Sequence, residues 1–322
     1  MTQPADPNRS VLDPRLQQVI KVIGLGILIG VSGAILANLF VAGIGWLNDT
    51  LLISPRSRMM QTDVLVLTAA TLLVPALGGL LVGLLHRHIK EGRAHGPAEI
   101  IAAVQTRRAR LPFKPAFLSA LSSLVSLGSG ASVGQYGPLV HLGGSVGSLW
   151  SRLFRTEITV DNIAIACGVA AAISTVFNAP IAGILFAHEL ILRHFALRAF
   201  APVAVASVVG YVVANAVLPQ PPLFQIDQAE VRHLWEYGLF LLLGVASALV
   251  AVGYMKAILG MGRFAGSLKV PTVLRPAVAG AGLGLAALWV PEILGIGSET
   301  LRFAFIDGAF GQWELLMVLL LK

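Results

Sequence analysis

The chain has 322 residues, of which 56% are hydrophobic and only 12% are charged, and its mean hydropathy is +0.80. These values exclude an ordinary soluble domain and predict a protein of the lipid bilayer. The formal net charge of +7 does not indicate a nucleic-acid partner, because the basic residues lie between apolar segments, as they do in the cytoplasmic loops of membrane proteins.

The N-terminal residues 1–16 are polar, and the apolar run that begins at residue 17 is too long for the core of a signal peptide. Residues 1–16 are therefore predicted to form a polar tail, followed by the first membrane span. The single cysteine, Cys167, excludes an internal disulfide and is expected to serve in packing.

Apolar segments continue along the chain and predict an all-α polytopic membrane protein. They cover residues 17–47, 63–87, 114–128, 137–153, 162–176, 180–218, 234–261, 274–290 and 312–321. Several are too short to cross a hydrocarbon core of about 30 Å, and their Gly/Pro interruptions favour half-spanning helices that meet near the midplane. The 180–218 run is long enough for two helices, separated around residues 193–198.

The region between the second and third segments is strongly basic. Its basic residues are Arg87, Lys90, Arg93, Arg107, Arg108, Arg110 and Lys114, against the acidic residues Glu91 and Glu99. This pattern predicts a cytoplasmic loop. Because two spans precede the loop, the N-terminus is also predicted to be cytoplasmic, in a multi-pass protein of the cell membrane.

The segment 128–140, GSGASVGQYGPLV, contains four glycines, and the last of them directly precedes Pro138. Glycine lets the backbone approach another group closely, and proline is favoured in a first helical turn. Within a membrane, irregular backbone is tolerated where it is buried in protein or lines a polar cavity. A Gly-rich turn that enters a helix there offers free amide donors and a positive dipole end to an anion. Tight helix packing is the alternative use of these small residues.

An internal repeat divides the chain. The run PALGGLLVGLL (75–85) aligns without gaps with PAVAGAGLGLA (276–286), and Glu99 and Glu299 follow the two runs at almost the same distance. We therefore expect three parts: the polar cytoplasmic tail (1–16), a first membrane repeat (17–218) and a partial second membrane repeat (219–322).

Three motifs resemble segments of a known family. The run FNAPIAGILFAHE (177–189) is similar to the motif FNAPLAGxLFxxE, GQYGP (134–138) resembles a GxEGP loop, and AHGPAE (94–99) resembles a GSGIPE turn. The run PEILGIG (291–297) looks like a further segment of the same family. These are motifs of the CLC family of chloride channels and proton/chloride antiporters.

The resemblance implies a CLC-like inverted-repeat bundle that forms a homodimer, with a separate anion pathway in each subunit. Helix N-termini would converge on a partly dehydrated chloride, held mainly by backbone amides, which bind an anion without trapping it. Fluoride or nitrate is an alternative ion. The anion-binding residues that the resemblance implies are His95, Gly96, Gly134, Gln135, Tyr136, Gly137 and Pro138.

The departures from the family pattern bear on proton coupling. Tyr136 stands at the position of the family's gating glutamate and is neutral at ordinary pH, because its unperturbed pKa is about 10. Leu190 follows Glu189 where proton-coupled relatives carry a second acid, and His95 replaces the serine of the GSGIPE turn. Passive conduction is therefore expected, with proton/chloride antiport as an alternative.

A non-transporting, truncated membrane scaffold is the other alternative. The family's GxFxP loop and its chloride-contacting tyrosine would lie beyond Lys322, so the second repeat is expected to be incomplete.

Each candidate residue also has a structural interpretation. Tyr136 can be a packing aromatic and His95 a solvated loop histidine. Glu189 can be a proton-path residue or a structural partner, either of Arg193 one helical turn later or of backbone donors. A zinc-binding helix is excluded because Leu192 stands where its second histidine would be. A dinucleotide-binding fold lacks its strand–turn–helix context. No enzyme activity, metal or cofactor is predicted.

Overall fold

The computed structural model describes residues 14–89, 91–106, 111–217, 231, 233–305 and 310–322. Every regular element in these ranges is helical, which confirms the all-α prediction. The predicted tail lies almost wholly outside the described residues, as do Lys90, Arg107, Arg108 and Arg110 of the basic loop. The elements are α1 (Pro14–Thr50), α2 (Pro55–Met60), α3 (Val64–His86), α4 (Pro97–Gln105), α5 (Phe113–Gly128), α6 (Tyr136–Leu153), α7 (Ile158–Phe177), α8 (Pro180–Phe186), the π-helix η1 (Ala187–Leu192), α9 (Leu197–Val217), α10 (Glu236–Ser267), α11 (Arg275–Ala286), the 3-10 helix η2 (Pro291–Ile293), α12 (Ser298–Ala304) and α13 (Gln312–Leu321).

The described chain contains both long and short apolar helices. Five stretches are long and apolar enough to cross a bilayer: Gln17–Met60, Val64–His86, Ile158–Phe177, Leu197–Ala216 and Glu236–Ser267. Shorter apolar helices cover Phe113–Gly128, Pro180–Leu192 and Gln312–Leu321. This mixture agrees with the prediction of half-spanning helices among full spans.

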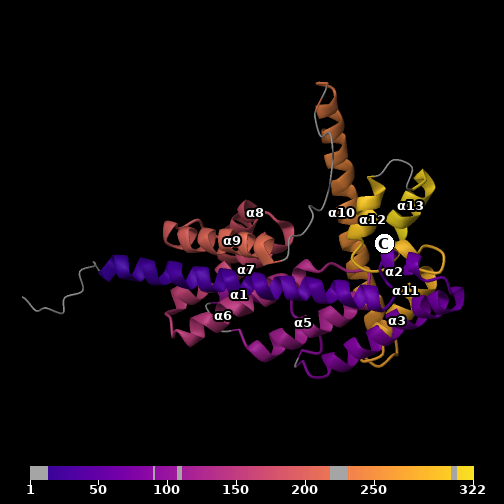
Figure 1. The fold of residues 1–322 in the computed structure, drawn as a ribbon, viewed down its shortest axis with the longest axis horizontal. Helices are drawn as coiled ribbons and strands as arrows, with labels where there is room; N and C mark the ends of the chain where they lie inside the picture. Colours follow the sequence, from indigo (N-terminus) through magenta and orange to yellow (C-terminus); the bar gives the residue numbers. More distant parts are fainter. Residues whose placement is uncertain (1–13, 90, 107–110, 218–230, 232, 306–309) are drawn as a thin grey trace, which may run out of the picture.

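Helix α7 is the central element of the helices that precede α10. It packs against α1, α6, α8 and α9, and Figure 1 shows it between α9 and α1. A side-chain carbon on Gly168 of α7 would collide with the backbone of Gly143 in α6, and one on Gly147 would collide with the backbone of Ala164. Small residues of this kind let helix backbones approach closely inside a membrane.

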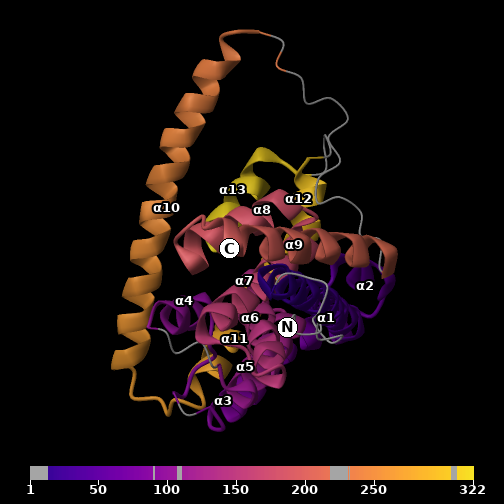
Figure 2. The ribbon, with the colours of Figure 1, turned by 90° about the vertical axis from the view of Figure 1, so that its left-hand side faces the viewer.

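Helix α10 stands apart from this bundle. None of its residues is buried, and Figure 2 shows it along one edge of the molecule. Its 32 residues are apolar enough to span a bilayer. A long exposed surface of this composition suits contact with lipid rather than with water.

The long apolar run 180–218 is interrupted, as expected, near residue 193. Helix α8 continues into the π-helix η1, which ends where Arg193 adopts a left-handed backbone conformation with a φ of 58°. Helix α9 begins at Leu197. The prediction of two helices within this run is therefore confirmed.

The two copies of the internal repeat pack against each other through corresponding residues. A side-chain carbon on Gly79 of α3 would collide with the backbone of Pro276, and one on Gly280 of α11 would collide with the backbone of Pro75. These glycines and prolines occupy equivalent positions in the aligned runs. Because the pairing order reverses along the chain, the two helices run antiparallel, as in an inverted repeat.

Gly280→Ala is expected to lower the unfolding temperature in detergent relative to Gly282→Ala. Both substitutions add one methyl group to α11 and gain up to about 1 kcal/mol in helix propensity. No atom lies within 4 Å of a side-chain carbon at Gly282, whereas Gly280 faces the backbone of Pro75. Overpacking at such a contact costs about 1–3 kcal/mol. Equal unfolding temperatures for the two variants would contradict the close contact.

Candidate functional site

The Gly-rich segment between α5 and α6 serves two purposes. At its start, a side-chain carbon on Gly128 would collide with Leu47 of α1, and Gly130 has a φ of 91° beside Ile53. At its end, Gly134 is exposed, with no atom within 4 Å of where its side-chain carbon would be. The start of the segment is thus a packing motif, and only its end is free to line a site.

The first turn of α6 leaves its amide donors open. Gln135 is the N-cap residue, but no side chain caps the helix, and Pro138 lies in the first turn. Among the described residues, nothing accepts a hydrogen bond from the amides of Tyr136 or Gly137. Such amides, together with the positive end of the helix dipole, favour a negatively charged ligand.

The ring of Tyr136 stacks on the ring of Phe177, the last residue of α7. Their centroids are 4.1 Å apart and their planes are inclined by 22°. Both residues line two cavities. The stacked pair is therefore a shared wall, and a solute that passed from one cavity to the other at this point would meet it.

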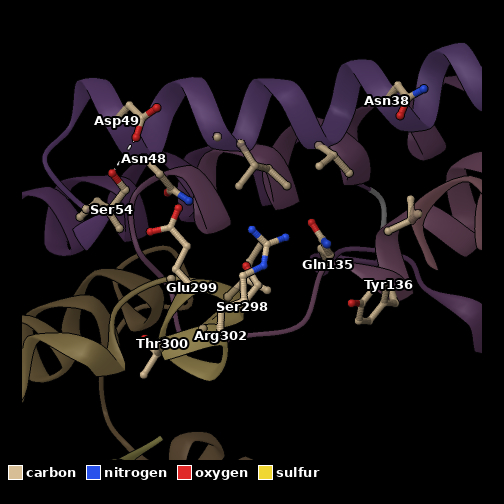
Figure 3. A pocket seen from close by; sticks show the side chains of 18 of the residues that line it. Asn38, Asn48, Asp49, Ser54, Gln135, Tyr136, Ser298, Glu299, Thr300 and Arg302 are labelled. Carbon is tan, nitrogen blue, oxygen red and sulfur yellow. Dashed lines mark hydrogen bonds between the residues drawn. The ribbon is translucent and has the colours of Figure 1, made fainter. Parts of the chain in front are cut away.

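The first cavity, called here the polar cavity, has a volume of about 240 Å³ and is bounded by α1, the start of α6, the end of α7, α9 and residues 294–302. Figure 3 shows Asn38 on α1 and Gln135 and Tyr136 at one end, with Asp49 and Ser54 at the other. Its polar side chains are those of Asn38, Asn48, Asp49, Ser54, Gln135, Tyr136, Thr175, Asn178, Asn215, Ser298, Glu299, Thr300 and Arg302.

The second cavity, called here the apolar cavity, has a volume of about 510 Å³. The starts of three helices contribute to its lining: Pro97 of α4, Gly137 of α6 and Ala179, the N-cap residue of α8. The remaining wall is hydrophobic. Convergence of helix N-termini on one space is the arrangement expected of an anion site in a membrane protein.

In the turn before α4, unlike at the start of α6, the backbone amides have hydrogen-bond acceptors within the protein. The amide of Gly96 donates to the carboxylate of Glu99 at 2.7 Å, and Arg93 pairs with Glu99 at 2.6 Å. The amide of His95 donates to the Ser119 hydroxyl at 2.9 Å. His95 and Gly96 line neither cavity, so Pro97 alone brings this turn to the site.

The ring of His95 is held by its neighbours. Its Nε2 atom lies 2.9 Å from the Glu91 carboxylate, and its edge meets the ring of His141 at a centroid distance of 5.5 Å. His95 is therefore not simply a solvated loop histidine, because its ring has specific partners on two sides.

Glu189 lies on η1, is exposed, and lines neither cavity. Within the described residues it forms no ion pair, so the expected pairing with Arg193 is wrong. The reason is the left-handed backbone of Arg193, which takes that residue out of the next helical turn.

Two residues of the site were missed by sequence reasoning. Phe177 was seen only as part of a motif, although it forms half of the wall with Tyr136. Asn38 was overlooked, although a lone amide in the middle of an apolar span is a signal that the sequence carries.

Known proteins match this chain over most of its length. Residues 78–322 match the family model described as Voltage gated chloride channel. A ClcB-like protein of Ralstonia nicotianae (strain ATCC BAA-1114 / GMI1000) is 31% identical over 238 residues, which are 71% of this chain and 54% of that protein. The Voltage-gated ClC-type chloride channel ClcB of Escherichia coli O9:H4 (strain HS) is 29% identical over 235 residues, 72% of this chain and 56% of that protein. The chain thus spans about half the length of the curated relatives it matches.

Solved structures share the fold. A slow cyanobacterial Cl⁻/H⁺ antiporter superposes with a TM-score of 0.80 at 19% identity, covering 96% of this chain and 73% of that chain. A CLC-type fluoride/proton antiporter superposes with a TM-score of 0.79 at 16% identity, covering 95% of this chain and 74% of that chain. At these identities the likeness shows the arrangement of helices alone.

Proposed function

The chain belongs to the voltage gated chloride channel family, and on that premise we propose that it carries chloride or another small anion past Tyr136. It is a multi-pass membrane protein. The observation that supports the proposal most directly is the start of α6, where unpaired amides adjoin the wall between the polar and apolar cavities. In the proposal, Gly134, Gln135, Tyr136, Gly137 and Pro138 form the binding turn. His95 and Gly96 line neither cavity and only position Pro97 at the start of α4.

The chemistry of this turn suits an ion that must bind and leave again. Backbone amides are neutral donors, so they stabilise a partly dehydrated anion less strongly than a buried lysine would. The stack of Tyr136 on Phe177 is an aromatic contact worth about 0.5–1.5 kcal/mol beyond its burial. Opening the wall costs this contact together with the burial of the two rings, and Tyr136 is proposed as the uncharged gate that moves when the stack opens.

Passive conduction is the mode that the residues favour. Tyr136 stands where the family pattern has a carboxylate, and Leu190 has no group that could carry a proton. Proton-coupled antiport is the second candidate, because the two solved structures of similar fold are described as a Cl⁻/H⁺ and a fluoride/proton antiporter. Glu189 is the proton-path candidate in that mode, although it lines neither cavity.

The proposal also includes the membrane location, the topology and the oligomeric state of the protein. The relatives named as chloride channels favour a cell-membrane location, and the basic loop after α3 favours a cytoplasmic N-terminus. The chain is proposed to act as a homodimer with one pathway in each subunit.

The protein in chloride-loaded liposomes is expected to release chloride with little movement of protons. Chloride and pH electrodes in the same vessel measure both ions, with a potassium ionophore to remove the membrane potential and protein-free liposomes as the control. Proton uptake against its own gradient, driven by chloride efflux, would instead support antiport. Absence of chloride release would support a scaffold.

Tyr136→Glu is expected to make chloride flux dependent on pH, and Tyr136→Phe serves as its neutral control. A carboxylate at this position would compete with the anion when ionised and release the site when protonated, near or above its unperturbed pKa of about 4.3. Flux through Tyr136→Glu should therefore rise about tenfold between pH 7 and pH 4.5, which corresponds to roughly 1.4 kcal/mol of competition. Tyr136→Phe should show no such rise. A flux of Tyr136→Glu that stays constant over this range would remove Tyr136 from the pathway.

A further inference from the structure

Asn38 is a buried amide on a span that is otherwise built for lipid. It lies in the middle of α1 and is only 4% exposed. Its Nδ2 atom has no hydrogen-bond partner among the described residues. Burial of an amide donor without a partner is unfavourable, so the position calls for a ligand or another polar group.

Gln135, which lines the same space, also has an unpartnered amide atom, but this atom is an acceptor rather than a donor. The residue is 8% exposed, and its Oε1 atom is unpartnered within the described chain. Both side chains line the polar cavity. Figure 3 shows Asn38 on α1 at the same end of the cavity as Gln135 and Tyr136. Two unsatisfied amides thus share the end of the cavity that adjoins the proposed gate.

The charge distribution of the polar cavity favours an anion at this end. Asp49 accepts a hydrogen bond from the Ser54 hydroxyl at 2.6 Å, and Figure 3 shows this pair at the far end from Tyr136. The same view shows the guanidinium of Arg302 between Glu299 and Gln135. A cationic group therefore stands between the carboxylates and the amide end.

We propose that Asn38 and Gln135 bind a chloride-sized anion in the polar cavity, one step before the Tyr136 gate. The NH₂ group of Asn38 is already without an acceptor, whereas Gln135 must rotate about its last bond to replace its unpartnered oxygen by its NH₂ group. The nearly equal shape of the two ends of an amide allows this rotation. This site rests on the proposed function, since it would supply the ion that passes Tyr136.

Asn48 provides a matched control on the same helix. It also lines the polar cavity, but its amide nitrogen, in the orientation that satisfies both of its polar atoms, donates to the carbonyls of Leu127 and Gly128 at 3.0 Å each. Its amide is already used to hold α1 against the end of α5. Substitution at Asn48 should therefore affect stability, whereas substitution at Asn38 should affect binding.

The test is a calorimetric titration of chloride into the purified protein in lipid nanodiscs, in a buffer whose anion is too large for the cavity. Asn38→Leu is expected to weaken chloride binding about tenfold, the loss of one hydrogen bond to an ion, with an unfolding temperature that is unchanged or higher. Asn38→Asp, which keeps the shape and adds a negative charge, should weaken binding further. Asn48→Leu should keep the chloride affinity and lower the unfolding temperature.

Unchanged chloride affinity in both Asn38 variants would overturn the proposed site, as would destabilisation of Asn38→Leu as large as that of Asn48→Leu. The comparison with Tyr136→Glu separates this inference from the function. If chloride binding depends on Asn38 while the flux of Tyr136→Glu is insensitive to pH, the site stands and the gate fails. If the flux of Tyr136→Glu depends on pH while Asn38→Leu binds normally, only the site fails.

Discussion

The backbone contact between α6 and α7 is the interaction on which the rest of the structure depends. Neither Gly143 nor Gly168 has room for a side-chain carbon, and Gly147 meets the backbone of Ala164 in the same way. These contacts set one antiparallel register for the two helices. Followed about two turns back along α6 and a little further along α7, the register leads to Tyr136 and Phe177, whose rings stack at 4.1 Å. The wall between the two cavities is therefore a consequence of glycine packing elsewhere.

The starts of α4 and α6 differ in whether a side chain accepts hydrogen bonds from the free backbone amides of the helix. At α4, the Glu99 carboxylate accepts from the Gly96 amide and is itself paired with Arg93. At α6, no side chain takes that place, although both helix starts reach the apolar cavity. One helix end is thus satisfied within the protein, while the donors of the other have no acceptor among the described residues. This difference favours Tyr136 over His95 as the centre of the proposed anion site.

The features that were predictable from sequence are the local ones. Apolar runs and their interruptions determine where helices begin and end, so the break before α9 and the start of α6 near Pro138 could be anticipated. The partner of Tyr136 could not, because it depends on the register between two helices. The inward position of Asn38 depends likewise on how α1 is rotated against its neighbours. Composition alone also could not divide the Gly-rich segment into a packing end at Gly128 and an open end at Gly134.

The reciprocal contact of α3 with α11 has the geometry of an isologous dimer interface enclosed within one chain. In such an interface one position meets a second position of the other copy, and the second meets the first in return, so that a change in the shared sequence is felt twice. Once the two copies are separate parts of one chain, they can diverge, but each glycine still faces the backbone at the other copy's proline. A bulkier residue in one of the two helices would force the backbone of the other helix to move. The contacting pair, rather than either residue, is then the unit that can change during evolution.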